Sequence, residues 1–313
     1  WFTSVAQPAV LSALGALAEA SHEDRERLVE VAAQILSGVD PALLTTGRAI
    51  TRLQLHLAAR RKVPELMAAV SCERSGELAQ RRAVRDGADL VADLPFRGDD
   101  TVAVPREVFL LDDELIVRSR VDRVRWDGPL LTVEGYAHLA LLDVAEPGAD
   151  VLELTLVRTA DQRRVPMTVE RTHRPEVTTE AREATYTYDF AGFRATVDVH
   201  QLRDDEAFAY GTWRLEATVT NQGVRRTRIV TTTTPGAVRH ASLHDLADVR
   251  IVTVTGRGTF TVEVDTLPVP LTAAELRDGA LRLSGTLRRS AARGHATLQV
   301  VRSSGLVALA VPM

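Results

Sequence analysis

Arginine clusters are the residues of this sequence whose type and spacing best fit a binding chemistry. Arg225, Arg226 and Arg228 lie almost side by side at a predicted turn between two strands, and Arg163 and Arg164 lie at another. A guanidinium group binds phosphate through two parallel hydrogen bonds, so these clusters suit contact with a polyanion. Solvated turn charge is the alternative interpretation, and the sequence leaves both open.

Aromatic side chains form the second candidate site, because they are only 4% of the chain and gather in one stretch of it. Tyr186 and Tyr188 share one face of a predicted strand by the two-residue period. Both are therefore the better candidates for a surface position, where their rings could stack on a sugar, and a position in the core is the alternative. Trp126, Phe193 and Trp213 are predicted in the core instead, because large aromatic side chains dominate buried area.

Other residue types that could do chemistry lack the spacing that the chemistry needs. The acidic pairs at 99–100, 112–113 and 204–205 fall in predicted turns, where aspartate commonly bonds nearby backbone. The eight histidines show no metal-ligand spacing, and Cys72 has no evident base partner. Residues 256–258 do not complete a phosphate loop. We therefore expect no catalytic residue, no cofactor and no metal ion.

Composition narrows the functional classes further. The chain has 313 residues, which suggests about two domains, and its net charge of −4 gives no basis for nucleic-acid binding. No apolar run approaches the roughly 18 residues that a membrane span needs. A single cysteine favours a reducing compartment. We expect a cytoplasmic protein, either free or at the inner face of the membrane, with no transmembrane segment.

Helices come first among the elements that must position these residues. Ser21 is a predicted N-cap, and Gly38 is the predicted end of the helix that Ser21 begins. Asp40 and Pro41 start the next helix, as an N-cap followed by proline in the first turn. The pattern predicts helices through residues 1–80.

Strands take over after about residue 80, where β-branched residues alternate with polar ones. Asp127 and Gly128 predict a tight turn between the first two strands. This pattern predicts a mainly β chain with an N-terminal α-helical segment and immunoglobulin-like antiparallel β-sandwich modules. The predicted strands are 114–125, 130–139, 152–158, 165–170, 185–199, 212–220 and 224–232.

A weak internal repeat sets the predicted domain boundaries, since residues 127–135 resemble residues 278–285. We predict a helical connector over 1–80, following a catalytic domain that is absent from this chain. An extended linker and a first β-sandwich module span 81–236. A partial or truncated second module spans 237–313.

Four short motifs resemble a known group of proteins. Residues 125–128 (RWDG), 134–137 (EGYA), 188–193 (YDFAGF) and 211–215 (GTWRL) occur in an order similar to that in the C-terminal modules of actinobacterial family-2 glycosyltransferases and CDP-glycerol glycerophosphotransferases. The region is also similar to the C-terminal region of wall teichoic acid glycosyltransferases. The resemblance covers most of residues 40–230.

The resemblance implies a function without catalysis. In that family an N-terminal nucleotide-sugar domain does the chemistry, and no motif of that domain occurs here. We therefore expect the non-catalytic C-terminal part of a cell-wall or capsular polymer glycosyltransferase. It is expected to form a homo-oligomer, to bind an anionic polyol-phosphate polymer or glycan, or to do both. The expected polymer-binding residues are Arg225, Arg226, Arg228, Tyr186 and Tyr188. The alternative is a stand-alone carbohydrate-binding or adhesion β-sandwich protein.

Overall fold

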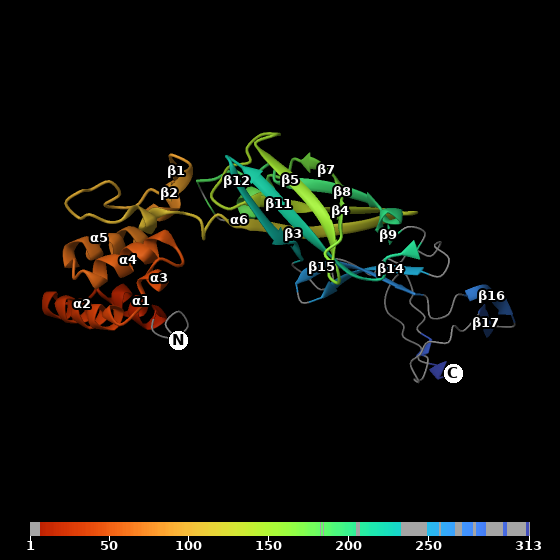
Figure 1. Ribbon diagram of the computed structural model, residues 1–313, viewed down its shortest axis with the longest axis horizontal. Helices are drawn as coiled ribbons and strands as arrows, with labels where there is room; N and C mark the ends of the chain where they lie inside the picture. The colour runs from red at the N-terminus through yellow and green to blue at the C-terminus, as the bar shows by residue number, and fades with distance from the viewer. Residues whose placement is uncertain are drawn as a thin grey trace.

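The computed structural model describes most of the chain up to residue 232 and parts of it beyond. The described residues are 7–181, 183, 185–204, 207–232, 249–256, 258–266, 271–277, 280–285, 297–298 and 311–312. Figure 1 shows a helical part at the N-terminal side and a large sheet that follows it. Arg257, Asp205 and the start of the predicted second module lie outside the described residues.

The helical part follows the signals that the sequence carries for helix ends. The Ser21 side chain accepts a hydrogen bond from the Asp24 amide, Gly38 caps the same helix, and Asp40 caps the next one ahead of Pro41. These predicted ends are confirmed. The helices are α1 (Gln7–Ala16), α2 (His22–Ser37), α3 (Pro41–Leu44), α4 (Ala49–Ala59) and α5 (Val63–Arg74).

Helix α4 joins the helical part to the chain that leads into the sheet. It carries Arg52, whose side chain is only 3% exposed. The Arg52 guanidinium donates to the carbonyls of Val108 (3.1 Å), Leu110 and Gly47 (2.9 Å). This anchors the connecting segment, whose elements are η2 (Glu77–Gln80), β1 (Ala83–Asp86), β2 (Asp89–Ala92) and η3 (Arg106–Phe109).

One large sheet follows, with the strand order β6-β5-β11-β15-β13-β3-β4-β8-β7, while β12 pairs with β11 and β14 with β15. All its pairs are antiparallel except β13 with β3. The strands are β3 (Val117–Asp127), β4 (Leu130–Leu139), β5 (Asp150–Arg158), β6 (Arg164–Pro166), β7 (Thr168–Thr172), β8 (Gly192–Asp198), β11 (Gly211–Asn221), β12 (Val224–Ile229), β13 (Thr231–Thr232), β14 (Val249–Gly256) and β15 (Thr259–Thr266). Helix α6 (Glu176–Ala181) and η4 (Val199–Leu202) lie between them in sequence, as does the pair β9 (Arg203–Asp204) and β10 (Ala207–Phe208).

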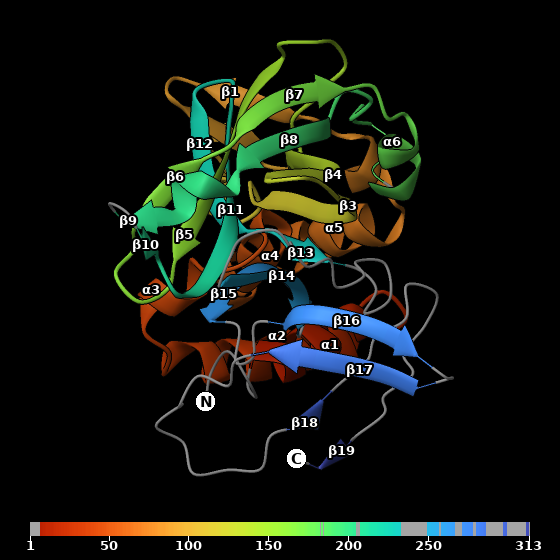
Figure 2. The ribbon, with the colours of Figure 1, turned by 90° about the vertical axis from the view of Figure 1, so that its right-hand side faces the viewer.

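The two halves of this sheet contribute buried side chains to one hydrophobic core, and Figure 2 shows their strands in end view. Strands β3, β4, β7 and β8 form one half, and β5, β6, β11 and β12 form the other. Trp213 and Phe193 lie in the core as predicted, and Trp126 packs against it from a partly buried position. The chain is thus mainly β, with antiparallel pairing and an N-terminal helical segment.

Two predicted strands differ from the observed ones. The stretch 165–170 divides into β6 and β7, which pair with opposite halves of the sheet, because the Met167 amide bonds to the Leu154 carbonyl where the chain crosses over. The stretch 185–199 forms a strand only from Gly192 onward. Residues 185–191 form a loop instead, which matters for the two predicted tyrosines.

The strands after residue 248 join the first sheet. Strand β15 pairs with both β11 and β13, so the predicted boundary at residue 236 does not separate two sheets in the described chain. Two short pairs follow, β16 (Leu271–Arg277) with β17 (Ala280–Gly285) and β18 (Thr297–Leu298) with β19 (Val311–Pro312). The division into domains stays a prediction. No helix in the described residues is long and apolar enough to cross a membrane.

Candidate binding site: an arginine row on strand β3

The predicted arginine cluster does not form one surface patch. Arg225, Arg226 and Arg228 lie within strand β12 rather than in the turn before it. Side chains alternate across a strand, so Arg225 lies on the opposite face from Arg226 and Arg228. The sequence predicted a turn at these arginines, whereas the residues form a strand.

Two of these arginines are also paired with carboxylates. The Arg225 guanidinium lies 2.7 Å from the Glu153 carboxylate, and that of Arg226 lies 2.8 Å from Asp112. Arg228 donates to a backbone carbonyl at 3.4 Å and has no carboxylate partner among the described residues. Paired charges attract a polyanion less than free ones, because each carboxylate offsets part of the positive potential.

The prediction that Tyr186 and Tyr188 lie at the surface is wrong. The two side chains are 7% and 0% exposed, and they pack in a small second core that also holds Val177. The Tyr186 hydroxyl accepts from the Ala83 amide (2.7 Å), and the Tyr188 hydroxyl accepts from the Leu141 amide (3.1 Å). Neither ring has a free face for a sugar, because the loop 185–191 folds them inward instead of running as a strand.

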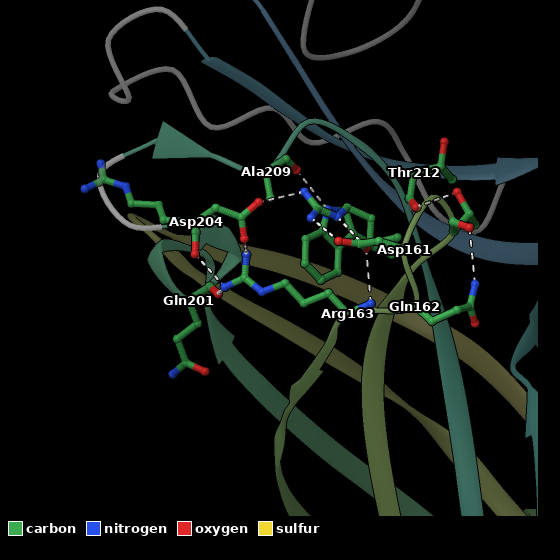
Figure 3. Close-up of polar contacts among 11 residues, drawn as sticks. Asp161, Gln162, Arg163, Gln201, Asp204, Ala209 and Thr212 are labelled. Carbon is green, nitrogen blue, oxygen red and sulfur yellow. Dashed lines mark hydrogen bonds and ion pairs between the residues drawn. The ribbon is translucent and has the colours of Figure 1, made fainter.

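The cluster around Arg163 is a structural network (Figure 3). Arg158 and Arg163 both bond to the Asp204 carboxylate, and both guanidinium groups lie over the buried Trp213 ring, at 5.6 and 5.7 Å from its centroid. Arg158 also bonds to Asp161, which lowers the pKa of that carboxyl to about 2. The arginine and aspartate side chains of this network bond to one another, so the cluster has little unpaired charge for a ligand.

The remaining sequence candidates are likewise tied into the fold. Asp99 accepts from the Thr101 amide (2.8 Å), and Asp113 accepts from the Gly47 amide (2.9 Å). Cys72 is buried, and burial raises the pKa of its thiol. In the part of the chain that the structure describes, no group of three or more His, Cys, Asp or Glu residues is placed to hold a metal ion.

Strand β3 carries a row of arginines that the sequence reasoning missed. Arg118, Arg120, Arg123 and Arg125 lie opposite four residues of one face of β4, namely His138, Tyr136, Glu134 and Thr132. All four therefore share the outer face of the sheet. Alternate residues of a strand are spaced by about 6.6 Å, so the guanidinium groups start from regularly spaced positions.

A β-bulge keeps the row on one face. The sequence has two residues, not one, between Arg120 and Arg123, so strict alternation would turn Arg123 and Arg125 toward the core. The register shifts between Val121 and Arg123, and this extra residue restores the outward phase. Gly135 lies opposite the bulge, where a Cβ atom would come within 2.0 Å of the Arg120 carbonyl oxygen. The spacing R-x-R-x-x-R-x-R was the available signal.

The ends of the row are its least neutralised parts. Arg120 is bound by Asp122 (2.5 Å) and Glu180 (2.7 Å), and Arg123 lies 3.9 Å from Glu134. Arg118 and Arg125 are exposed and form no ion pair within the described residues. A ligand anion can therefore approach the row at either end without displacing a carboxylate.

Two adjoining hollows lie at the Arg118 end of the row. One, of about 340 Å³, lies between β3, β4 and α6. The other, of about 590 Å³, reaches the helical part at Arg48 and Glu73. Arg118 and Glu183 line both of them. The row and the hollows together form an extended polar surface, open to a chain-like ligand.

Comparison with known proteins finds two solved structures of low similarity. No family model matches the chain, and no curated protein matches it. It is similar to the crystal structure of S. aureus TarS 217–571, at 10% identity and a TM-score of 0.42, over 87% of this chain and 71% of that one. A second structure, of S. aureus TarS, gives 12% identity and a TM-score of 0.39 over 87% and 44%. The chain thus spans less than half of the second structure.

Proposed function

We propose that this chain is a non-catalytic accessory region that holds an anionic polyol-phosphate polymer along the arginine row of β3. The observation that carries the proposal is the placement of Arg118, Arg120, Arg123 and Arg125 on one face of one strand. The four residues occupy regularly spaced positions, as the phosphates of such a polymer do, and the unpaired guanidinium groups of Arg118 and Arg125 can each bind a phosphate through two hydrogen bonds.

The parent activity is the second part of the proposal, a cell-wall or capsular polymer glycosyltransferase. The support is the resemblance of motifs, two of which meet at the row: residues 125–128 close β3, and residues 134–137 lie on β4 beside it. An immunoglobulin-like β-sandwich architecture and a cytoplasmic location belong to the same proposal.

Self-association also remains part of the proposal. In the described sheet, β12 pairs only with β11 and β14 only with β15, so each has one side without a neighbouring strand. Such sides can pair with a second copy. Light scattering at micromolar concentration tests this, with a clean monomer as the result against it.

The test of polymer binding uses two matched double variants. Arg123→Gln with Arg125→Gln neutralises the end of the row that lies away from the two hollows. Arg225→Gln with Arg226→Gln removes the same charge from β12. We expect the first pair to weaken binding of a polyol-phosphate polymer by about tenfold or more, and the second to change it little. Binding of the wild-type chain should fall steeply between 0.1 and 1 M salt, as the Debye length shortens from about 10 to about 3 Å.

Three results would count against the row. Salt-independent binding removes the electrostatic mechanism. A larger loss of polymer affinity in the β12 variant would indicate that the polymer binds at Arg225 and Arg226, as the sequence first suggested. Tight binding of a neutral glycan, with no binding of the phosphate polymer, favours the stand-alone carbohydrate-binding alternative.

A further inference from the structure

The smaller hollow beside Arg118 is lined by a buried histidine that has an unpaired hydrogen-bond acceptor. The His138 side chain lines it and is 2% exposed. His138 Nδ1 lies 3.2 Å from the Leu139 carbonyl oxygen, which can only accept, so Nδ1 carries a proton. Burial lowers the pKa of His138 to about 4, so the ring is neutral at pH 7 and Nε2 presents a lone pair. Nε2 has no partner among the described residues.

The ring of His138 is held in place by its aromatic neighbours. Its centroid lies 3.8 Å from that of Tyr188 and 5.9 Å from that of Tyr136. Tyr188 is fixed in turn, because its hydroxyl accepts from the Leu141 amide and donates to the Glu183 carboxylate. An acceptor set this rigidly can recognise a ligand group at one position rather than many.

Three further groups of the polar lining have hydrogen-bonding capacity that the described residues do not use, whereas Arg120 and Glu180, which also line the hollow, are paired with each other. Glu183 uses one carboxylate oxygen for Tyr188, and no described residue donates to the other. The Tyr136 hydroxyl has no hydrogen-bond partner among the described residues, and burial raises its pKa, so it stays protonated as a donor. Arg118 lines the same hollow and forms no ion pair with Glu183. The site thus offers both donors and acceptors.

The numbers of hydrogen-bond donors and acceptors in the hollow indicate which class of ligand it can bind. His138 Nε2 and the free Glu183 oxygen both need a donor, and a phosphodiester has none. Glu180, although paired with Arg120, adds a second carboxylate that disfavours an anion. Hydroxyl groups satisfy the set, because each donates to one group and accepts from another. The volume of 340 Å³ falls in the usual range of about 300–1,000 Å³ for small-ligand sites.

We propose that this hollow binds a hydroxyl-rich unit, a polyol or a sugar ring, through His138, Glu183 and Tyr136. The link of this hollow with a polymer rests on the proposed function. In that case the arginine row binds the phosphates of the polymer, and the hollow binds the polyol or sugar unit between two phosphates. Binding of a free polyol does not depend on the row.

Sorbitol is the probe, titrated into the full 313-residue chain, with ¹⁵N shifts of the histidine rings as the readout. We expect saturable binding that moves the His138 Nε2 resonance, as a hydroxyl donates to it. His138→Phe keeps a flat ring against Tyr188 and should weaken sorbitol binding about tenfold. His173→Phe is the matched control, because His173 contacts Phe190 outside the hollow, and should bind normally. If His138→Phe does not fold, Tyr136→Phe removes only a hydroxyl and should weaken binding about threefold.

The outcomes separate this inference from the proposed function. Sorbitol binding that survives in Arg123→Gln with Arg125→Gln, while polymer binding is lost, supports both. Sorbitol binding without any polymer binding supports the hollow and removes the row. No shift of His138 at saturating sorbitol, or unchanged affinity in the folded His138→Phe or Tyr136→Phe chain, overturns the hollow. Binding of ethylamine in place of sorbitol would mean a cation site and also overturns it.

Discussion

The Arg171 guanidinium donates two hydrogen bonds to the Asp150 carboxylate, from Nε to Oδ1 at 3.0 Å and from Nη2 to Oδ2. The Asp150 side chain is only 1% exposed. Arg171 also donates to the carbonyls of Ala137 and Ala191. The pair joins β7 to β5 across the two halves of the sheet. Burial disfavours both charged forms, because it raises the pKa of Asp150 and lowers that of Arg171. Each residue therefore needs the opposite charge of the other to stay ionised.

Asp150→Asn should therefore destabilise the fold by about 3–5 kcal/mol, because it leaves the Arg171 charge buried without its counter-ion. The free energy of unfolding in urea is the measurement. Glu153→Gln, three residues along the same strand, is the control. It removes the exposed partner of Arg225 and should cost no more than about 1 kcal/mol. Equal losses in the two variants would show that the buried pair has no special weight.

Trp213 is the largest side chain in the core and is fully buried, with its indole nitrogen donating to the Ala209 carbonyl at 3.2 Å. Trp213→Ala should cost about 3–5 kcal/mol of unfolding free energy, from lost apolar burial and the cavity left behind. Tyr210→Ala removes an aromatic ring that is 47% exposed and should change stability by about 0.5 kcal/mol or less. A small effect of Trp213→Ala in denaturant melts would contradict the core placement.

Gly135 sets the bulge that orients the arginine row. Gly135→Ala should destabilise the fold by about 1–3 kcal/mol or more, because the new Cβ meets the Arg120 backbone, which cannot rotate away. Gly15→Ala is the control, since nothing lies within 4 Å of a Cβ there and the residue is in helix α1, where alanine is favourable. Unchanged stability in Gly135→Ala would mean that β3 and β4 separate more easily than the structure indicates.

His138 makes stability depend on pH. Its pKa in the folded chain is lowered to about 4, mainly by burial and further by the nearby charges of Arg171 and Arg118. The unfolded chain, with an ordinary value near 6.5, therefore takes up the proton first as pH falls. The stabilisation is complete above about pH 6.5 and is lost as pH falls toward 4.

Wild type should therefore lose about 2–3 kcal/mol more than His138→Phe between pH 7 and 4.5. Urea unfolding at the two pH values measures the difference. His56, whose pKa is also lowered to about 4, is present in both proteins and cancels in the comparison. His173→Phe provides the control and should behave as wild type. Parallel losses in wild type and His138→Phe would contradict the buried neutral ring.

The sequence by itself determined the local structure. Ser21, Gly38 and Asp40 mark helix ends because a cap depends on a few neighbouring residues, and these predictions are confirmed. Alternation and the turn at Gly128 likewise predicted strand β4 at 130–139, as observed. The core position of Trp213 followed from its size alone.

The candidate site was decided by tertiary contacts. The row needs a bulge at Asp122, which becomes visible only when β3 pairs with β4, since one extra residue turns every later side chain to the other face. Tyr188 is buried in the second core, where its hydroxyl accepts from the Leu141 amide, and Arg225 is neutralised by Glu153. Both Leu141 and Glu153 lie far away in sequence from their partners. Periodicity reports which face a side chain takes, whereas what covers that face depends on distant segments, so only the folded chain showed which charges stay free.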